Sequence, residues 1–104
     1  MLDAHYAPSA AVQVVTVDGV DAALANAAGP IGFLGPRSTP LPSGIARLDA
    51  PEPFVADALA PVLYRSLRLA DALGLGTLIV VAPDGEGLGP AVRDRLTRAA
   101  NSGP

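Results

Sequence analysis

Two short runs of this sequence are apolar at almost every position, and they limit the folds that the chain can adopt. Residues 12–17 read VQVVTV, and residues 77–82 read TLIVVA. A strand with one face in solvent alternates apolar and polar side chains, whereas a strand covered on both faces reads as a nearly continuous apolar run. The two runs therefore predict strands of a parallel sheet with helices on both faces. We expect residues 77–82 to form a central strand.

Other segments complete an alternation of strands and helices. Residues 20–28 are good helix formers that stop at a Gly-Pro pair, and a last helix is predicted to begin near Pro90. Residues 31–34 and 45–48 are short apolar runs, separated by a loop over 35–44 that contains three prolines. Strands that alternate with helices form parallel α/β layers joined by right-handed crossovers.

A longer helix is predicted before the second apolar run. Leu63, Leu67, Ala70 and Leu73 recur at spacings of four, three and three, so they share one helix face, which we expect to be buried. Pro61 lies within the same pattern, although proline inside a helix costs about 3 kcal/mol and lacks a backbone donor. We therefore expect either a kink at Pro61 or two helices, the second of which starts near it.

Composition and charge exclude several classes of function. The 104 residues suit one domain, and the net charge of −3 includes seven basic residues, all of them arginine. Because the arginines do not form one clustered basic patch, we expect no direct contact with nucleic acid. No apolar stretch approaches the roughly 20 residues of a membrane span, and no signal segment opens the chain. With no cysteine either, we expect a soluble, cytoplasmic domain with no membrane partner.

The glycine-rich segment over residues 84–89, DGEGLG, invites comparison with dinucleotide-binding turns. Those turns need G-x-G-x-x-G at a helix N-terminus, where backbone amides face the pyrophosphate. Here the spacing is G-x-G-x-G, and Pro90 removes one of the amides. Asp84 and Glu86 would also repel a phosphate. A tight turn whose acids favour the helix N-terminus is the better interpretation.

A second candidate is the polar loop that follows residues 31–34. Arg37, Ser38 and Thr39 come after the carboxyl end of a predicted strand, where α/β sheets usually bind ligands. Together with Glu86 and Gly87 they form a possible ligand loop. The segment lacks the lysine of a phosphate-binding P-loop. A simple surface loop is therefore the favoured alternative.

The residue types that carry catalysis do not converge in this sequence. His5 is the only histidine, and it is the only side chain suited to acid–base chemistry near neutral pH. One histidine without cysteine does not make a zinc site, and no serine lies in a G-x-S-x-G motif. We therefore expect no catalytic residues and no metal site. By itself the chain is typical of a ligand-binding or interaction domain, and a stand-alone enzyme is the least favoured interpretation.

Three stretches together resemble one known family. Residues 1–8, MLDAHYAP, resemble the linker that joins the two domains of long-form threonylcarbamoyl-AMP synthases. Residues 63–74, LYRSLRLADALG, are similar to that family's helix, L-[FY]-x-x-L-R-x-x-D-x-x-G. Residues 86–100, EGLGPAVRDRLTRAA, resemble its closing motif, E-G-L-G-x-A-[IV]-x-[DN]-R-L-x-[RK]-A-A. Because order and spacing agree, the resemblance covers nearly the whole chain.

The resemblance implies a fold and a partner. It implies a small three-layer Rossmann-like α/β domain over residues 12–104, with a mainly parallel sheet of four to five strands, after an interdomain-linker-like arm over residues 1–11. The full-length family uses ATP, L-threonine and bicarbonate to make threonylcarbamoyl-AMP for the t6A modification of tRNA, in a catalytic domain that is absent here. This chain would hold no cofactor, and its partner would be that catalytic domain, in cis or in trans.

The same resemblance implies which residues carry the role. In the family the linker lies over the catalytic cleft and helps to close it around nucleotide, so His5, Tyr6 and Pro8 are the expected contacts with the catalytic domain or its nucleotide. The chain would then be a non-catalytic regulatory or interaction domain that positions the linker. An autonomous small nucleotide- or small-molecule-binding α/β protein is the alternative.

Overall fold

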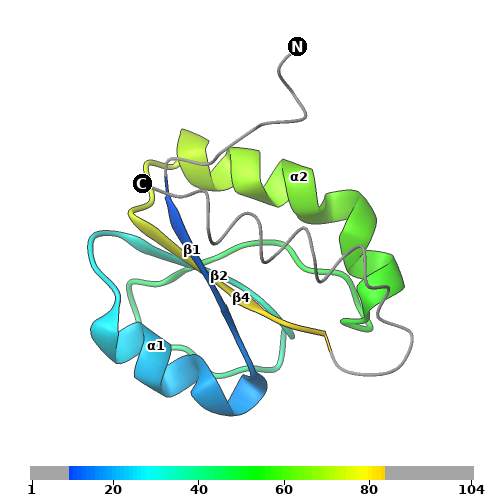
Figure 1. The fold of residues 1–104 in the computed structure, drawn as a ribbon, viewed down its shortest axis with the longest axis horizontal. Coiled ribbons are helices and arrows are strands. Elements are labelled where there is room, and N and C mark those ends of the chain that lie inside the picture. Colours follow the sequence, from blue (N-terminus) through cyan, green and yellow to red (C-terminus); the bar gives the residue numbers. More distant parts are fainter. Residues whose placement is uncertain (1–9, 84–104) are drawn as a thin grey trace.

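A computed structural model of the chain describes residues 10–83. Within this range four strands, one 3₁₀ turn and two α-helices follow one another along the chain (Figure 1). In order they are β1 (Ala11–Val15), η2 (Val17–Gly19), α1 (Val20–Asn26), β2 (Ile31–Leu34), β3 (Ala46–Arg47), α2 (Ala56–Ala72) and β4 (Thr77–Val81). The last helix, predicted to begin near Pro90, and residues 1–9 of the predicted arm lie outside the described residues.

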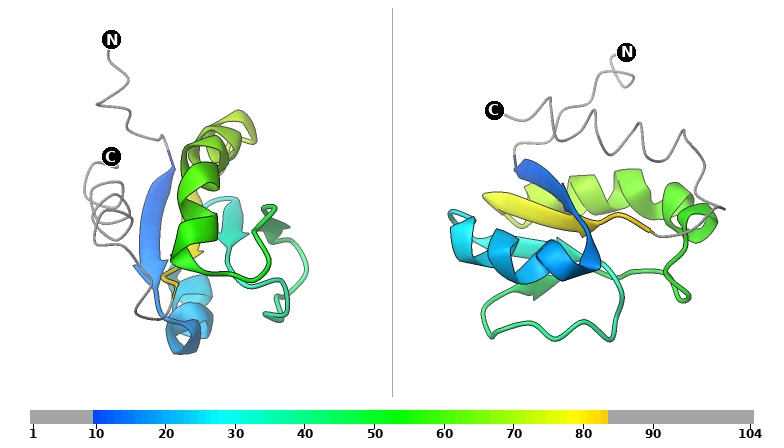
Figure 2. Two further views of the ribbon diagram at one scale, coloured as in Figure 1. Left: turned by 90° about the vertical axis from the view of Figure 1, so that its right-hand side faces the viewer. Right: turned by 60° about the horizontal axis from the view of Figure 1, so that its bottom comes forward.

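The four strands form one sheet in the order β1-β4-β2-β3, and every neighbouring pair is parallel. The strands lie between α2 on one face and α1 on the other (Figures 1 and 2). The described residues therefore form three layers, as expected for a small Rossmann-like α/β domain, and both the fold class and the number of strands are confirmed. The boundaries of the domain and of the arm stay predictions.

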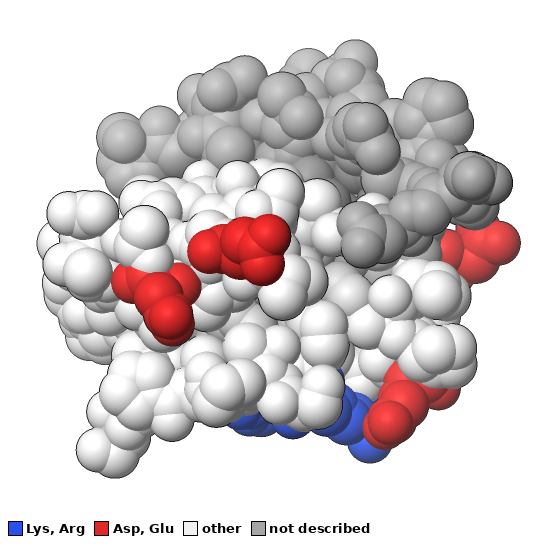
Figure 3. Space-filling view, turned by 90° about the horizontal axis from the view of Figure 1, so that it is seen from below, with Lys and Arg blue, Asp and Glu red and all other residues white. Residues whose placement is uncertain are grey.

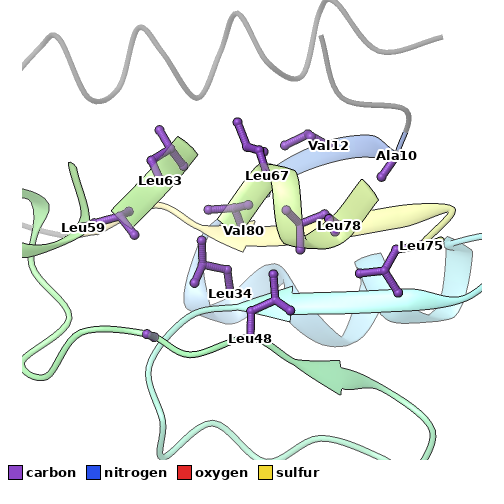
Figure 4. Packing of buried hydrophobic residues seen from close by; sticks show 12 residues of the cluster. Ala10, Val12, Leu34, Leu48, Leu59, Leu63, Leu67, Leu75, Leu78 and Val80 are labelled. Carbon is purple, nitrogen blue, oxygen red and sulfur yellow. The ribbon is translucent and has the colours of Figure 1, made fainter. Parts of the chain in front are cut away.

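The core is divided by the sheet into two clusters. On the α2 face, Leu78 and Val80 of β4 pack under Leu63 and Leu67 of α2 (Figure 4). On the α1 face the second cluster is made of these buried residues: Val20, Ala23, Phe33, Ile79 and Val81. Successive residues of β4 thus serve opposite clusters, and all five are buried. This is why residues 77–81 read as an unbroken apolar run, and the prediction of a central strand is confirmed.

Helix α2 runs without a break from Ala56 to Ala72, with Pro61 inside it. Proline cannot donate to the carbonyl of Asp57 four residues earlier, but both residues are exposed, so water can take the place of the lost donor. Figure 1 shows the first turns of α2 inclined to the rest of the helix. Of the two expectations for Pro61, a single kinked helix is therefore correct.

The predicted burial of Leu73 is wrong. Leu73 is 52% exposed, and it caps the helix rather than belonging to its regular part. Gly74 follows with φ of 70°, and two bonds close the helix end: Gly74 N–H donates to the carbonyl of Asp71, and Leu75 N–H to that of Ala70, both at 3.0 Å. This is the Schellman arrangement, and it turns Leu75 into the core while Leu73 points to solvent.

Several predicted boundaries move by one to three residues. Strand β1 ends at Val15, because the chain turns at once into η2, where Gly19 N–H donates to the carbonyl of Thr16 at 2.9 Å. Helix α1 ends at Asn26, and β3 contains only two residues. Within the described part of the chain, no helix is long and apolar enough to cross a membrane.

The helix end at Gly74 gives a first testable prediction. A side chain at Gly74 would meet no atom within 4 Å, so the cost of Gly74→Ala comes from the left-handed backbone alone. We expect this change to lower the free energy of unfolding by about 1–2 kcal/mol in urea denaturation. Gly19→Ala is the matched control, because Gly19 has φ of −91° and room for a Cβ. It should change the free energy by less than about 0.5 kcal/mol. Equal losses in the two variants would contradict the prediction.

Candidate functional site

The carboxyl ends of the four parallel strands meet at one rim of the sheet, and the candidate ligand loop lies there. Because β2 is the neighbour of β4, the loop that begins at Gly35 lies beside the segment that leaves β4 through Ala82 and Pro83. This rim is where open α/β sheets usually bind ligands. The loop that contains Arg37 therefore lies at this rim, and its role as a ligand loop stays a prediction. Glu86 and Gly87, the other half of the candidate site, lie outside the described residues.

The loop leaves β2 in close contact with the core. A Cβ on Gly35 would lie 2.6 Å from Cζ of Phe33 and 2.8 Å from Cγ2 of Val81, so only glycine fits against these two side chains. A tight turn follows, in which Thr39 N–H donates to the carbonyl of Pro36 at 3.1 Å. The turn containing Arg37, Ser38 and Thr39 is thus held close to the end of the sheet.

Arg37 connects this turn to the segment that follows β3. Its Nε and Nη2 donate to the carbonyl of Ala50 at 3.0 and 2.8 Å. The same guanidinium lies 3.4 Å from Oδ1 of Asp49 and 3.4 Å from Oε1 of Glu52. Both ion pairs are largely exposed, so each contributes little to stability, and the bonds to the buried Ala50 segment are the stronger restraint. A phosphate at Arg37 would have to compete with these partners.

Arg47, which the sequence analysis did not single out, holds the same turn from the other side. Its Nη1 donates to the carbonyls of Pro36 and Arg37 at 3.3 and 3.2 Å, and its Nη2 donates to the carbonyl of Thr39. The guanidinium carbon lies 5.6 Å from the centre of the Phe33 ring, within the range of a cation–π contact. Phe33 and Arg47 are register partners in β2 and β3, and no local pattern in the sequence reveals that pairing.

Positive and negative side chains lie close together at this rim, so their charges largely cancel. Figure 3 shows arginine atoms directly against carboxylate atoms at one rim of the surface. Ser38 is exposed beside them, and Thr39 is partly exposed. Within residues 10–83, no three histidine or acidic side chains are placed to hold a metal ion. The arrangement binds loop carbonyls and carboxylates of the chain itself, and its evident chemical role is to fix the loops after β2 and β3.

The predicted contacts of the arm cannot be placed in the same way. His5, Tyr6 and Pro8 lie outside the described residues, so their role stays a prediction. The structure brings Arg37 together with Asp49 and Glu52, two residues that the sequence analysis also missed. An acidic residue in a sequence does not indicate which arginine it will pair with. Asp49 and Glu52 lie 12 and 15 residues from Arg37 along the chain, and only the fold brings them together.

The contacts of Arg47 give a second prediction. Arg47→Lys keeps the positive charge but loses the planar fork that reaches three carbonyls, so we expect a loss of about 1 kcal/mol in the free energy of unfolding. Amide exchange at Thr39 should become faster, because its turn is less restrained. Arg65→Lys is the control, since the Arg65 guanidinium makes no hydrogen bond or ion pair within residues 10–83. Unchanged amide exchange at Thr39 in Arg47→Lys would contradict the role of Arg47 in restraining this turn.

Comparison with known proteins gives one family. The sequence matches the family described as threonylcarbamoyl-AMP synthase, C-terminal domain, over residues 1–101. Comparisons with curated proteins and with solved structures gave no significant match. The family match spans the α/β domain, the rim loops and the arm together, and it agrees with the three motifs found in the sequence. This chain therefore belongs to the family of threonylcarbamoyl-AMP synthase C-terminal domains.

Proposed function

We propose that this chain is a non-catalytic regulatory and interaction domain, which helps to position the arm that closes the nucleotide site of a threonylcarbamoyl-AMP synthase catalytic domain. The observation that carries the proposal is the extent of the family match, which begins at residue 1 and so includes the arm with the α/β domain. In this role the chain works in t6A biosynthesis. ATP, L-threonine and bicarbonate are bound by the catalytic domain and not by this chain.

The base of the arm is fixed to the core, which supports the proposal. Ala10, the first described residue, is fully buried in the cluster on the α2 face. The next residue is tied to the sheet, because Ala11 N–H donates to the carbonyl of Gly76 at 3.0 Å. The arm therefore starts from a point that the folded domain defines. A domain docked beside a catalytic cleft would fix where the arm begins.

The residues of the arm have the chemistry that such a contact needs. Tyr6 offers a flat ring and a hydroxyl donor, which together suit a partly polar cleft. A proline disfavours helical backbone in the residue before it, so Pro8 would restrict Ala7 and lower the entropy cost of binding. His5 adds a donor or acceptor beside them. These three residues are our proposed contacts with the catalytic domain or its nucleotide.

The arginine geometry favours this role over autonomous nucleotide binding. The donors of Arg37 face the carbonyl of Ala50 and two carboxylates, and the donors of Arg47 face loop carbonyls. A triphosphate at this rim would meet Asp49 and Glu52 as well as the arginines. The donors of the two arginines at the rim are thus occupied by groups of the chain itself.

Calorimetric titration of this chain into a separately produced catalytic domain tests the proposal. We expect binding that strengthens when ATP and L-threonine are present. Tyr6→Ala should weaken this binding at least tenfold, as for a central aromatic contact (about 1.4 kcal/mol or more). Tyr64→Ala is the control, because Tyr64 is the other tyrosine and is 47% exposed on α2. Absence of binding under every condition would refute the proposed function.

Arg37→Ala separates the two functions. Since Arg37 contacts its own chain, we expect the affinity for the catalytic domain to stay within about twofold of the unchanged protein, because surface substitutions away from a contact have small effects. We also expect no ATP binding by the isolated chain, either unchanged or as Arg37→Ala. Saturable ATP binding by the unchanged chain, lost in Arg37→Ala, would instead identify an autonomous nucleotide-binding protein.

A further inference from the structure

The amino ends of the strands form a second rim of the sheet, opposite to the rim that holds Arg37. Ala11 of β1 and Ile31 of β2 are both register partners of Thr77, the first residue of β4. The segments that precede these three strands therefore meet, and Figure 4 shows Ala10 and Leu75 at the same end of the sheet. We call this surface the amino rim, and it consists of residue 10 and the two turns over residues 28–30 and 73–76.

Direct contacts hold the parts of the amino rim together. Gly76 N–H donates to the carbonyl of Pro30 at 2.8 Å, and the hydroxyl of Thr77 donates to the carbonyl of Ala28 at 2.9 Å. A Cβ on Gly76 would lie only 3.0 Å from the carbonyl oxygen of Ala28, so the two turns pack backbone against backbone. Ala11 N–H donates to the carbonyl of Gly76 at 3.0 Å and joins the base of the arm to the same turns.

The two turns of the amino rim are exposed and uncharged. Every residue in them is exposed except Leu75, and Leu73 is 52% exposed. One helical turn before Leu73, Leu69 of α2 is 41% exposed. Neither turn contains a charged residue, whereas charged residues lie in the segments that follow β1, β2 and β3 at the opposite rim. The centre of a protein interface is depleted in charged residues, and the amino rim has this composition.

The arm indicates which partner would cover this surface. Nine residues precede Ala10, and a segment of that length spans at most about 30 Å. If the arm reaches the catalytic cleft, as the proposed function requires, the catalytic domain lies within this distance of Ala10. The amino rim surrounds the point where the arm joins the folded domain, so it is the exposed surface best placed to meet the catalytic domain.

We propose that the amino rim docks against an uncharged, apolar surface of the catalytic domain, with Leu73 as the central contact. This inference rests on the proposed function and adds to it the surface through which the two domains meet. Leu73 is the largest exposed side chain of the two turns, and a Cβ at the neighbouring Gly74 would meet no atom within 4 Å, so a partner can approach closely. Because this contact is apolar and separate from the nucleotide, it should contribute equally with and without ATP.

Calorimetric titration of Leu73 variants of the full chain into the catalytic domain tests this inference. Leu73→Glu and Leu73→Arg should each weaken binding about tenfold or more, because either charge would be buried without a partner. The loss should be the same with and without ATP and L-threonine, whereas the loss in Tyr6→Ala should be larger when both are present. Val17→Glu and Val17→Arg are the matched controls and should bind like the unchanged protein, because Val17 is 55% exposed at the opposite rim.

A variant in the other turn completes the test. Ala28→Glu should also weaken binding, and it keeps the test decisive if the Leu73 variants fail to fold, since Ala28 is exposed and bonds to Thr77 only through its backbone carbonyl. If Tyr6→Ala weakens binding but the Leu73 and Ala28 variants do not, this docking surface is wrong and the proposed function stands. A loss in only one of the two Leu73 variants overturns the inference too, because it indicates a charged contact. Absence of binding by the unchanged chain refutes the proposed function, and this inference with it.

Discussion

The position of β4 is the constraint on which the rest of the structure depends. β1 and β2 do not pair with each other. Each pairs with β4, which comes last among the described strands and inserts between them. Its alternate residues then hold α2 on one face and α1 on the other. The N-terminal strand, helix and strand therefore become a sheet only when residues more than 40 positions later have joined them. Such long-range pairing makes the whole domain one cooperative unit.

The rim at the carboxyl ends of the strands is organised by two arginines. Arg47 covers Phe33 and collects the carbonyls of the turn after β2, while Arg37 in that turn reaches the segment after β3. Arg47 thus holds the turn that contains Arg37, and Arg37 holds the segment that follows Arg47. Arginine is a natural phosphate ligand, but Arg37 and Arg47 both bind groups of the chain itself. This arrangement suits a domain whose role is structural support.

A support of this kind suits the proposed role. Ala10, near the end of the predicted arm, is buried in the same cluster that holds α2 against the sheet, so the arm is joined to the core at this point. On this proposal the domain needs no reactive group of its own, because the chemistry belongs to the catalytic domain. Its sheet would define where the arm that contains Tyr6 starts.

The sequence by itself determined the layers of this protein, because local patterns report which faces of a segment are buried. It predicted the parallel α/β class, the strand at Ile31–Leu34, the central β4 and the helix stop at Gly74. It was wrong at Leu73, where a cap turns the chain off the helix face. Only the tertiary structure decided the insertion of β4 between β1 and β2 and the partners of Arg37 and Arg47. Those partners lie 8 to 15 residues away along the chain, and periodicity carries no information about contacts that depend on strand order and loop path.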